Sequence, residues 1–548
     1  MGSSEVVADV AVVGGGHNGL VCAAYLARAG LDVVVVEQNE RCGGALFSST
    51  VDGVTLEHGG VEHTTIVASD IVSELDLAGH GLEYRYRTVG ALHRFGDGVQ
   101  LLIAETVDET AASIAELDVD DAEAWRSLAD EATRMMALLG AVSSGRPPTM
   151  ATLRRAAWLL GAADRALLDL ATSSVLDLAA SRFADPHVRA MAISRAGFSG
   201  LPAWAPGTGA VFALTPAGHG RRYGRPVGGS SALVDALERC ATAAGVRIIT
   251  ATSVRSLQRD DQRWTLTTTG AVGRVQATRV VSAIPPQVTM LELVPRPMVP
   301  RRLRRRLAGI EVNVGNLSQF TLASRLVRPP DLGVLGRHVD AAASMLWLLA
   351  APEDATASHG AAAVGALAPR PSLVATFPSL TDPSSADGSA ASLWINGFLA
   401  RRLAGGREWT SADEAVAAER IWATMQACLP GVRDLVDHEV FTSPGSLAAR
   451  TGAEDPGSHV AGTLGQLLGA RPARGMARHR SGIEGLYLTG AGTNPGPSIS
   501  GLPGRACARA LLDDLGVDGP AGRIRRLADE LGIEVRRARS LLELTRSG

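Results

Sequence analysis

The chain has 548 residues, a formal net charge of −3 at pH 7 and five cysteines. A chain of this length exceeds one ordinary hydrophobic core and predicts at least two domains. The near-neutral charge, without a basic stripe in either half, argues against nucleic acid as a partner. The cysteines are scattered and odd in number, which excludes a disulfide framework and a zinc site, so no metal is expected.

The basic residues are all arginine, and the absence of lysine excludes a Walker A phosphate loop and a Schiff-base enzyme. The mean hydropathy of +0.12 is on the apolar side. Charged residues, glycine or proline still interrupt each long apolar stretch before the roughly 18 to 20 residues of a membrane span. The N-terminus has no basic segment typical of a signal peptide. We therefore expect a cytoplasmic protein with an apolar substrate or a peripheral membrane contact.

The first elements in chain order form a βαβ unit. The pattern predicts a strand over 8–13, a helix over 18–28 and a second, buried strand over 32–36. Such a unit opens a Rossmann-type dinucleotide-binding domain when its first turn carries glycines at the right spacing.

That turn carries a GxGxxG motif. Gly14 permits the tight turn, Gly16 lets a pyrophosphate approach the backbone, and Gly19 lets helix and strand pack closely. The amide groups at the helix start then face the phosphates. We expect His17 and Asn18, which lie inside the motif, to contact the same dinucleotide.

Glu37 ends the second strand about 20 residues after the glycines, where the acid that binds the ribose is expected. A carboxylate there would repel the 2′-phosphate of NADP, but it does not separate NAD from FAD. Gly43 and Gly44 follow six residues later, where the chain must pass close beneath a long dinucleotide. NAD enzymes have no general need for this second glycine pair, so the pattern favours FAD.

A similar arrangement of strand, turn and helix lies near the C-terminus, in GLYLTGAGTNPGPSISGLPG over 485–504. A strand is predicted over 486–488, Gly490 and Gly492 form a turn, and Pro503 is the first residue of a helix. The positive end of that helix would face the N1/C2 edge of a flavin, which becomes negative on reduction. The N-terminal turn would then hold the ADP half of FAD, and the C-terminal turn the isoalloxazine.

These motifs resemble the FAD-dependent phytoene desaturase-like oxidoreductase superfamily, and within it the branch that includes pyridine nucleotide-disulfide oxidoreductase domain-containing protein 2. The resemblance extends over almost the whole chain. Its most specific motifs are GGGHNGLVCAAYLARAG over 14–30, GGALFSS over 43–49 and GLYLTGAGTNPGPSISGLPGRACARALL over 485–512.

The resemblance implies an α/β protein that binds FAD noncovalently. Its Rossmann-type, two-dinucleotide-binding domain would be built from the separated segments 1–85, 220–300 and 475–519. An inserted α+β substrate domain would comprise 86–219, with a break at 143–148, and 301–474. A helical tail would follow over 520–548, able to pack on its own domain, dock on another copy of the chain or lie on a membrane.

The resemblance also implies further cofactor contacts. The backbone near Val254 would contact the adenine, after a helix over 231–244 and a strand over 246–251. The other implied cofactor-binding residues are Ala45, Gly59, Gly60, Thr493, Ser500, Gly501 and Leu502. Ala45 stands where carotenoid desaturases usually carry an arginine, and Asn494 to Pro497 replace a common His-Pro-Gly-Gly sequence. Both departures weaken the prediction of a carotenoid substrate.

The expected activity is hydride transfer from a C–H bond of an apolar or natural-product-like molecule to flavin N5, with loss of a neighbouring proton and formation of a C=C or C=N bond. The candidate catalytic residues are His63 and His459, both matched to family histidines. His63 could equally serve only as a hydrogen-bonding residue. The electron acceptor could be oxygen, a quinone or another protein.

The sequence leaves other functions open. A flavin amine oxidase shares the FAD motifs, but many of that family use a lysine, and aromatic residues form only 4% of this chain. A redox-neutral isomerase that uses reduced FAD is a further alternative. A non-enzymatic flavoprotein fits less well, because both cofactor turns are intact.

Overall fold

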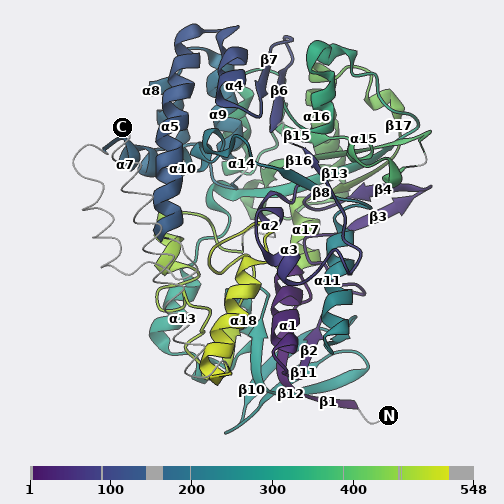
Figure 1. Cartoon of the computed structure of the whole chain (residues 1–548), viewed down its shortest axis with the longest axis vertical. Helices are drawn as coiled ribbons and strands as arrows, with labels where there is room; N and C mark the ends of the chain where they lie inside the picture. Colours follow the sequence, from purple (N-terminus) through teal and green to yellow (C-terminus); the bar gives the residue numbers. More distant parts are fainter. Residues whose placement is uncertain are drawn as a thin grey trace.

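The computed structural model describes residues 4–87, 90–142, 165–197, 199–386, 388–454, 457 and 459–517. The predicted tail over 520–548 and the predicted break at 143–148 lie outside these residues. The architecture contains two seven-stranded sheets, one in the lower and one in the upper half of the view in Figure 1. The α/β fold class predicted from the sequence is confirmed.

The first sheet has the order β10-β11-β12-β1-β2-β9, and β18 also pairs with β12. Its core is parallel, because β1 runs parallel to β2 and β12, β2 to β9, and β12 to β18. The four valines of β2 are all buried, as expected for a strand covered on both faces. The strands are β1 (Ser4–Val13), β2 (Val33–Val36), β9 (Arg247–Ile249), β10 (Val254–Arg259), β11 (Trp264–Thr268), β12 (Val272–Ser282) and β18 (Leu486–Leu488).

Helices from distant parts of the chain pack on the first sheet. α1 (His17–Arg28) contacts both α11 (Ser231–Ala243) and α18 (Leu502–Leu515), and Figure 1 shows α1 and α18 side by side. The close approach of α18 requires glycine, because a Cβ on Gly504 would overlap the backbone oxygen of Asn18. The first and last helices of the described fold are thereby packed together.

The second sheet has the order β17-β13-β16-β15-β14-β6-β7, and its pairs are antiparallel except β14 with β6. Both faces are buried. Leu346 and Leu348 of β14 pack with α16 (Ser411–Cys428), whereas Met345 and Trp347 face a helical layer on the other side. The strands are β6 (Ala91–Phe95), β7 (Gln100–Ile103), β13 (Leu317–Leu326), β14 (Met345–Leu349), β15 (Leu373–Thr376), β16 (Ala391–Ala400) and β17 (Val436–Thr442).

The helical layer packs around one apolar cluster that includes Trp125, Phe212, Trp347 and Trp394. Its helices are α4 (Val107–Ala115), α5 (Val119–Val142), α7 (Arg165–Thr172), α8 (Val175–Arg182), α9 (Pro186–Gly197), α10 (Thr208–Ala213) and α14 (Asp354–Ala363). α4 begins with a capping box, in which the side chains of Thr106 and Glu109 each accept a backbone N–H of the other residue.

Short elements connect the two sheets. The hairpin β3 (Ser48–Val51) and β4 (Val54–Glu57) contacts the second sheet, and Thr321 Oγ1 donates to the backbone oxygen of His58 at 2.9 Å. The remaining strands and helices are β5 (Tyr84–Arg87), β8 (Tyr223–Pro226), α2 (Thr64–Val67), α3 (Ile71–Glu74), α12 (Pro286–Val288), α13 (Arg301–Ala308), α15 (Pro378–Thr381) and α17 (Pro444–Thr451). Single turns are η2 (Pro216–Gly218), η4 (Arg296–Met298), η5 (Val314–Asn316), η7 (Pro383–Ser385), η8 (Ala404–Gly406), η9 (Arg433–Leu435), η10 (Leu464–Gln466) and η11 (Leu468–Ala470), with the longer η3 (Thr289–Leu293) and η6 (Gly333–Ala343).

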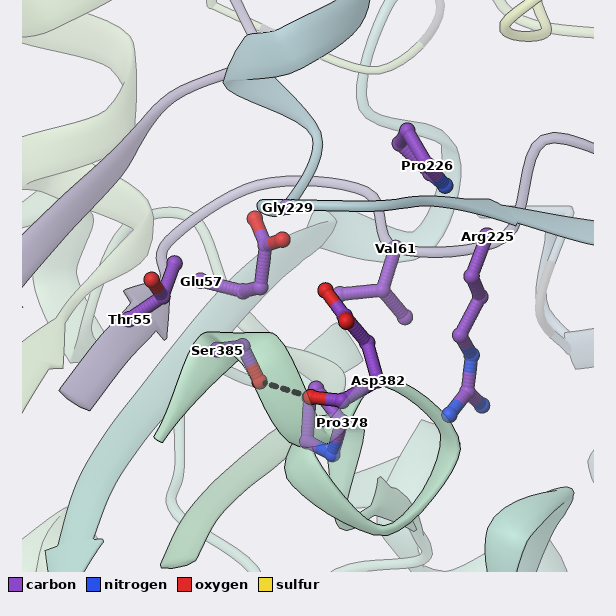
Figure 2. A pocket seen from close by; sticks show the side chains of 9 residues that line it. All are labelled: Thr55, Glu57, Val61, Arg225, Pro226, Gly229, Pro378, Asp382 and Ser385. Atoms are coloured by element: carbon purple, nitrogen blue, oxygen red, sulfur yellow. Dashed lines mark hydrogen bonds between the residues drawn. The ribbon is translucent and has the colours of Figure 1, made fainter. Parts of the chain in front are cut away.

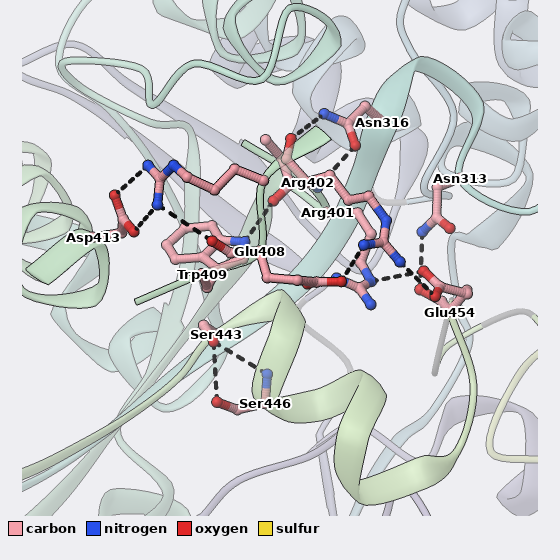
Figure 3. Close-up of polar contacts among 12 residues, drawn as sticks. Asn313, Asn316, Arg401, Arg402, Glu408, Trp409, Asp413, Ser443, Ser446 and Glu454 are labelled. Carbon is pink, nitrogen blue, oxygen red and sulfur yellow. Dashed lines mark hydrogen bonds and ion pairs between the residues drawn. The ribbon is translucent and has the colours of Figure 1, made fainter. Parts of the chain in front are cut away.

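A polar cluster, shown in Figure 3, fixes the chain after α17 to the second sheet. Glu454 forms ion pairs of 3.0 Å with both Arg401 and Arg402, which follow β16. Asn313 Nδ2 donates to the backbone oxygen of Glu454 at 3.1 Å. His459 follows this anchored segment in the sequence.

The predicted elements agree with the structure to within a few residues. The helix predicted over 231–244 is α11, the strand over 246–251 is β9, and the strand over 486–488 is β18. The C-terminal helix begins at Leu502 rather than Pro503, because Gly501 takes the left-handed capping conformation with φ of 66°. All five cysteines are buried, and their thiols are free in the structure. The limits of the domains stay predictions.

Candidate functional site

The N-terminal glycine turn has the geometry that a dinucleotide cradle requires. Gly14 takes φ of +98°, and a Cβ on Gly19 would overlap the backbone oxygen of Gly14, so helix and strand pack closely there. A Cβ on Gly16 would meet nothing within 4 Å, so the backbone at this position faces open space. Gly16 also caps α1 without a side-chain hydrogen bond, which leaves the first amides of the helix available to phosphate oxygens.

Glu37 is buried beside this turn. Its carboxylate accepts hydrogen bonds from the backbone N–H of Gly15 at 2.7 Å and from the backbone and side chain of Asn39 at 2.9 and 2.7 Å. These donors compensate the burial of its charge. The backbone of Glu37 pairs with Ile249 and Thr252, which places the acid next to the start of β10, where Val254 lies.

The second glycine pair packs against the first turn. Gly43 N–H donates to the backbone oxygen of Gly15 at 3.0 Å, and Gly43 and Gly44 have φ of +134° and +60°. A Cβ on Gly59 would overlap the backbone oxygen of Ala45. The segments around Gly14, Gly43 and Gly59 are therefore stacked against one another, as the sequence implied for a chain that passes beneath a long cofactor.

The C-terminal turn is stabilised by contacts with residues that lie outside the turn. A Cβ on Gly492 would lie 2.8 Å from Pro286 Cδ and 3.2 Å from His459 Cβ. Arg471, with no exposed surface, donates from Nη2 to the backbone oxygens of Ala491 at 2.6 Å and Val460 at 2.9 Å. Sequence reasoning missed Arg471, because its role depends on backbone groups that no local pattern reveals.

The two turns meet at the starts of α1 and α18. His17 Nε2 lies 3.0 Å from Asn18 Nδ2 and 3.3 Å from the backbone oxygen of Ser498, two residues before Ser500. Thr493 bonds back to Gly490 at 2.9 Å, which closes the C-terminal turn. The N-termini of both helices, with their positive dipole ends, thus border one region.

The structure brings the remaining predicted contacts to the same region. A Cβ on Gly60 would lie 2.8 Å from Ile499, and the Gly501 that caps α18 packs against Val21 of α1. Leu502 follows directly as the first residue of α18.

His63 is fully buried and has protein partners on both ring nitrogens. Nδ1 lies 2.9 Å from the Tyr84 hydroxyl, and Nε2 lies 3.2 Å from Ser230 Oγ. Because Ser230 Oγ donates to the backbone oxygen of Gly60 at 2.6 Å, it accepts from His63 Nε2–H. Burial lowers the pKa of His63 to about 3, so the ring is neutral. This geometry favours a role in positioning the segment at Gly60, and the predicted catalytic role stays a prediction.

His459 differs from His63. Its backbone has φ of +57°, its backbone oxygen accepts from Gln287 Nε2 at 3.0 Å, and its Nδ1 is buried without a hydrogen-bond partner among the described residues. Burial, followed by the charges of Arg471 and His17, lowers the pKa of His459 to about 4. A neutral imidazole with a free ring nitrogen therefore lies beside Gly492.

A second polar group that the sequence did not reveal lies behind Gly59 and Gly60. Figure 2 shows Glu57, Asp382 and Arg225 around a small pocket, whose volume of about 20 Å³ is sufficient for one water molecule. Glu57 accepts from Ser230 N–H at 2.7 Å and Ser48 Oγ at 2.9 Å, and burial raises its pKa to about 7.

A larger cavity of about 330 Å³ borders the loop after Cys42. It has the size of a small-molecule site. The Arg450 guanidinium lies 3.8 Å from the centre of the Phe47 ring, which stacks on His58 with ring centres 5.3 Å apart. Leu46 and Cys42 form the wall of the cavity nearest the glycine pair.

The fold and this site define a flavoprotein oxidoreductase with a dinucleotide-binding domain. The chain belongs to the flavin-containing amine oxidoreductase family, whose model matches residues 19–501. FAD is the cofactor, and the open cradle at Gly16 fits its diphosphate. The C-terminal turn over 485–504 contains no cysteine for a covalent bond.

Three comparisons illustrate these relationships. The chain is 26% identical to pyridine nucleotide-disulfide oxidoreductase domain-containing protein 2 of Rattus norvegicus, over 92% of this chain and 94% of the relative. It is 51% identical to a carotenoid 3,4-desaturase of Haloarcula japonica, over 9% of this chain and 10% of the relative. A solved putrescine oxidase mutant shares the fold, with a TM-score of 0.63 and 19% identity over 93% of this chain and 99% of that chain. The resemblance indicated by the motifs is confirmed.

Within the described residues, no helix combines the length and the apolar character needed to cross a membrane.

Proposed function

We propose that the protein is a FAD-dependent dehydrogenase that removes a hydride and a neighbouring proton from an apolar, natural-product-like molecule, forming a C=C or C=N bond. The observation that carries this proposal is the apolar surface next to the glycines. Val61, which follows Gly60, is 2% exposed and belongs to the same apolar cluster as Met345, Trp347 and Trp394. The side chains around a substrate bound on this side of the glycines would therefore be hydrocarbon and indole groups.

The cofactor would be held by the residues already described. Gly14, Gly16, Gly19 and Glu37 would bind the ADP half, and the turn at Gly492 would bind the ring. When bound, FAD supplies the hydride acceptor, and the protein supplies position and a dry pocket.

His459 is proposed to accept the proton or to orient the substrate. Its Nδ1 has no partner among the described residues, and its lowered pKa keeps the ring neutral at pH 7. A weak base is sufficient, because loss of a hydride makes the neighbouring C–H bonds strongly acidic. His63 is proposed to act indirectly, since Ser230 connects it to Gly60.

An amine substrate is the second candidate. The buried carboxyl groups of Glu57, Glu62 and Asp382 provide acidic groups that could attract an ammonium ion. However, Glu62 is already paired with Arg87 and Arg225 at 2.7 and 2.6 Å. Asp382 accepts from Gly228 N–H at 2.7 Å, and the raised pKa of Glu57 reduces its charge at pH 7. These contacts favour the apolar substrate.

The test is anaerobic mixing of the purified holoenzyme with two panels, one of cyclic and polyene hydrocarbons and one of primary amines. Bleaching of the flavin absorbance by the first panel supports the proposal, and bleaching only by amines establishes the second candidate. His459→Gln should slow bleaching, whereas His479→Gln should not, because His479 is a buried histidine whose Nδ1 bonds to Leu488 O at 2.9 Å. Reoxidation by oxygen, a quinone or a protein acceptor identifies the proposed electron acceptor.

A further inference from the structure

Arg195, near the end of α9, is a cation inside the apolar cluster of the helical layer. Its Nε donates to Thr215 Oγ1 at 2.8 Å, and its Cζ lies 4.9 Å from the centre of the Trp347 ring. Its Nη1 is buried and has no hydrogen-bond partner in the part of the chain that the structure describes. A guanidinium has N–H donors on all of its nitrogens. The Nη1 donor of Arg195 is therefore not used in a hydrogen bond to the described residues.

The charge of Arg195 is not compensated by a carboxylate among the described residues, because it forms no ion pair with any of them. Burial lowers its pKa to about 10, and the groups whose charges act on it are Tyr223 and Arg87, of which neither is a carboxylic acid. Arg195 is only partly buried, and a partly buried cation without a carboxylate partner is a candidate site for a ligand of opposite charge.

Other polar atoms with unused hydrogen-bonding capacity toward the described residues lie in the same layer. Trp125 is fully buried, and its Nε1 has no acceptor there. His219 stacks edge-on against Trp125 with ring centres 5.9 Å apart, and Arg195 lowers its pKa further after burial. His219 Nδ1 lies 3.1 Å from the backbone oxygen of Ala104, while its Nε2 has no such contact. Trp347 and His219 therefore lie near Arg195, and Trp125 and His219 add unused hydrogen-bonding atoms in the same layer.

This layer continues to the cofactor segment. Arg225, which pairs with Glu62 two residues after Gly60, lies with Nη2 3.7 Å from Met345 Sδ. Met345 and Trp347 are two residues apart on β14, a spacing of about 7 Å along a strand. Trp347 in turn contacts Arg195. A molecule that reaches from Gly60 to Arg195 would therefore lie along apolar side chains and end at a partly buried cation.

We propose that Arg195 binds the carboxylate of an amphipathic acid substrate, whose apolar body lies along Met345 and Trp347 with its reacting carbon toward Gly60. The inference rests on the proposed function for the reaction, but the carboxylate site can be tested without turnover. The substrate class is thereby narrowed from apolar molecules in general to apolar molecules with one acidic end.

The experiment is isothermal titration of the holoenzyme with octanoate and, separately, with 1-octanol. Arg195→Met should weaken octanoate binding by about 10- to 100-fold, the effect of losing a hydrogen bond to a charged group, and leave octanol binding unchanged. Arg195→Lys should recover part of the octanoate affinity. Arg189→Met is the matched control, because Arg189 lies on the same helix and bonds to the backbone oxygen of Phe183 at 2.6 Å.

Thermal unfolding separates this role from a structural one. Without ligand, Arg195→Met should unfold at the same or a higher temperature than the parent, because it removes a partly buried charge that has no carboxylate partner among the described residues. The inference is overturned if the parent does not bind octanoate, if Arg195→Met binds it equally well, or if Arg195→Met unfolds at a markedly lower temperature. If octanoate binds through Arg195 but no panel bleaches the flavin, the carboxylate site stands and the proposed reaction fails.

Discussion

The two glycine turns differ in how they are stabilised. The turn at Gly14 is closed within the opening βαβ unit, with Gly19 packed on Gly14 and Glu37 bonded to Gly15. The turn at Gly492 packs against Pro286 and is bonded through Ala491 to Arg471, which also bonds to Val460. In the proposed arrangement, the turn that would bind the ADP half lies within one βαβ unit, whereas the turn that would bind the flavin ring is connected to the segment that carries His459. A change in the second turn should therefore leave ADP binding by the first turn intact. A change in the first turn should weaken the binding of whole FAD.

The largest effect is expected at Glu37. Glu37→Arg places a cation where the acceptor for the ribose hydroxyls stands and removes the partners of Gly15 and Asn39. Binding of both FAD and ADP should fall by more than about 1000-fold, consistent with the loss of several charge-assisted hydrogen bonds. Fluorescence titration measures this, and Glu40→Arg, an exposed position with the same charge change, should bind normally. Unchanged FAD affinity would mean that the ADP half lies elsewhere.

Arg471→Met tests the C-terminal turn at Gly492, to which Arg471 is bonded. Its loss leaves the buried backbone oxygens of Val460 and Ala491 without these donors. The free energy of unfolding should fall by about 3 kcal/mol. FAD should bind more weakly while ADP binding stays near normal, and exposed Arg474→Met should behave as the parent. Equal losses of FAD and ADP binding would show that the turns are not independent.

Gly492→Asp changes the second turn alone. The new side chain would crowd Pro286 and His459 and place negative charge near the flavin edge. We expect FAD binding to weaken by roughly 30-fold and the flavin potential to fall, consistent with helix-end and charge effects of about 1 to 2 kcal/mol. Gly462→Asp is the control, because a Cβ there would meet nothing within 4 Å. Loss of ADP binding with a normal potential would contradict the assignment.

The change that leaves both turns intact concerns Glu57 and pH. Its pKa is about 7 in the folded protein, above the ordinary value of 4.5, because it is buried. The unfolded chain releases this proton near pH 4.5, whereas the native state keeps it until about pH 7. The unfolded state thus binds fewer protons in this window, and stability falls as pH rises through it.

Glu57→Gln, which resembles the protonated form, should remove most of that loss, about 2.5 kcal/mol between pH 5 and pH 8 for this pKa shift. Urea unfolding of both proteins at about pH 5 and about pH 8, on either side of most of this window, measures the difference. If the difference in stability between the variants is the same at both pH values, Glu57 is ionised in the fold.

The sequence predicted contacts between residues that are close in the chain. It did not reveal contacts between residues that are far apart in the chain. The spacing of Gly14, Gly16 and Gly19 indicated the cradle, because each glycine acts on its immediate neighbours. Glu57 and Ser230 are 173 residues apart, so no short pattern could reveal their bond. Arg195 was missed for the same reason, since its role depends on which groups the fold places around it. The start of α18 was misplaced by one residue, because a positive φ at Gly501 is a property of packing rather than of composition.

The position of β18 has a consequence for the order of events on the ribosome. β12 ends at Ser282, but the strand that lies along its last residues, β18, begins only at Leu486. The last residues of β12 therefore lack their partner strand β18 until the chain from Ser282 to Leu486 is translated. Most strands of the second sheet are translated in that interval. The turn proposed to bind the flavin ring therefore cannot form until β18 and the residues that follow it have been translated. A protein truncated before Leu486 would leave an exposed strand edge prone to aggregation.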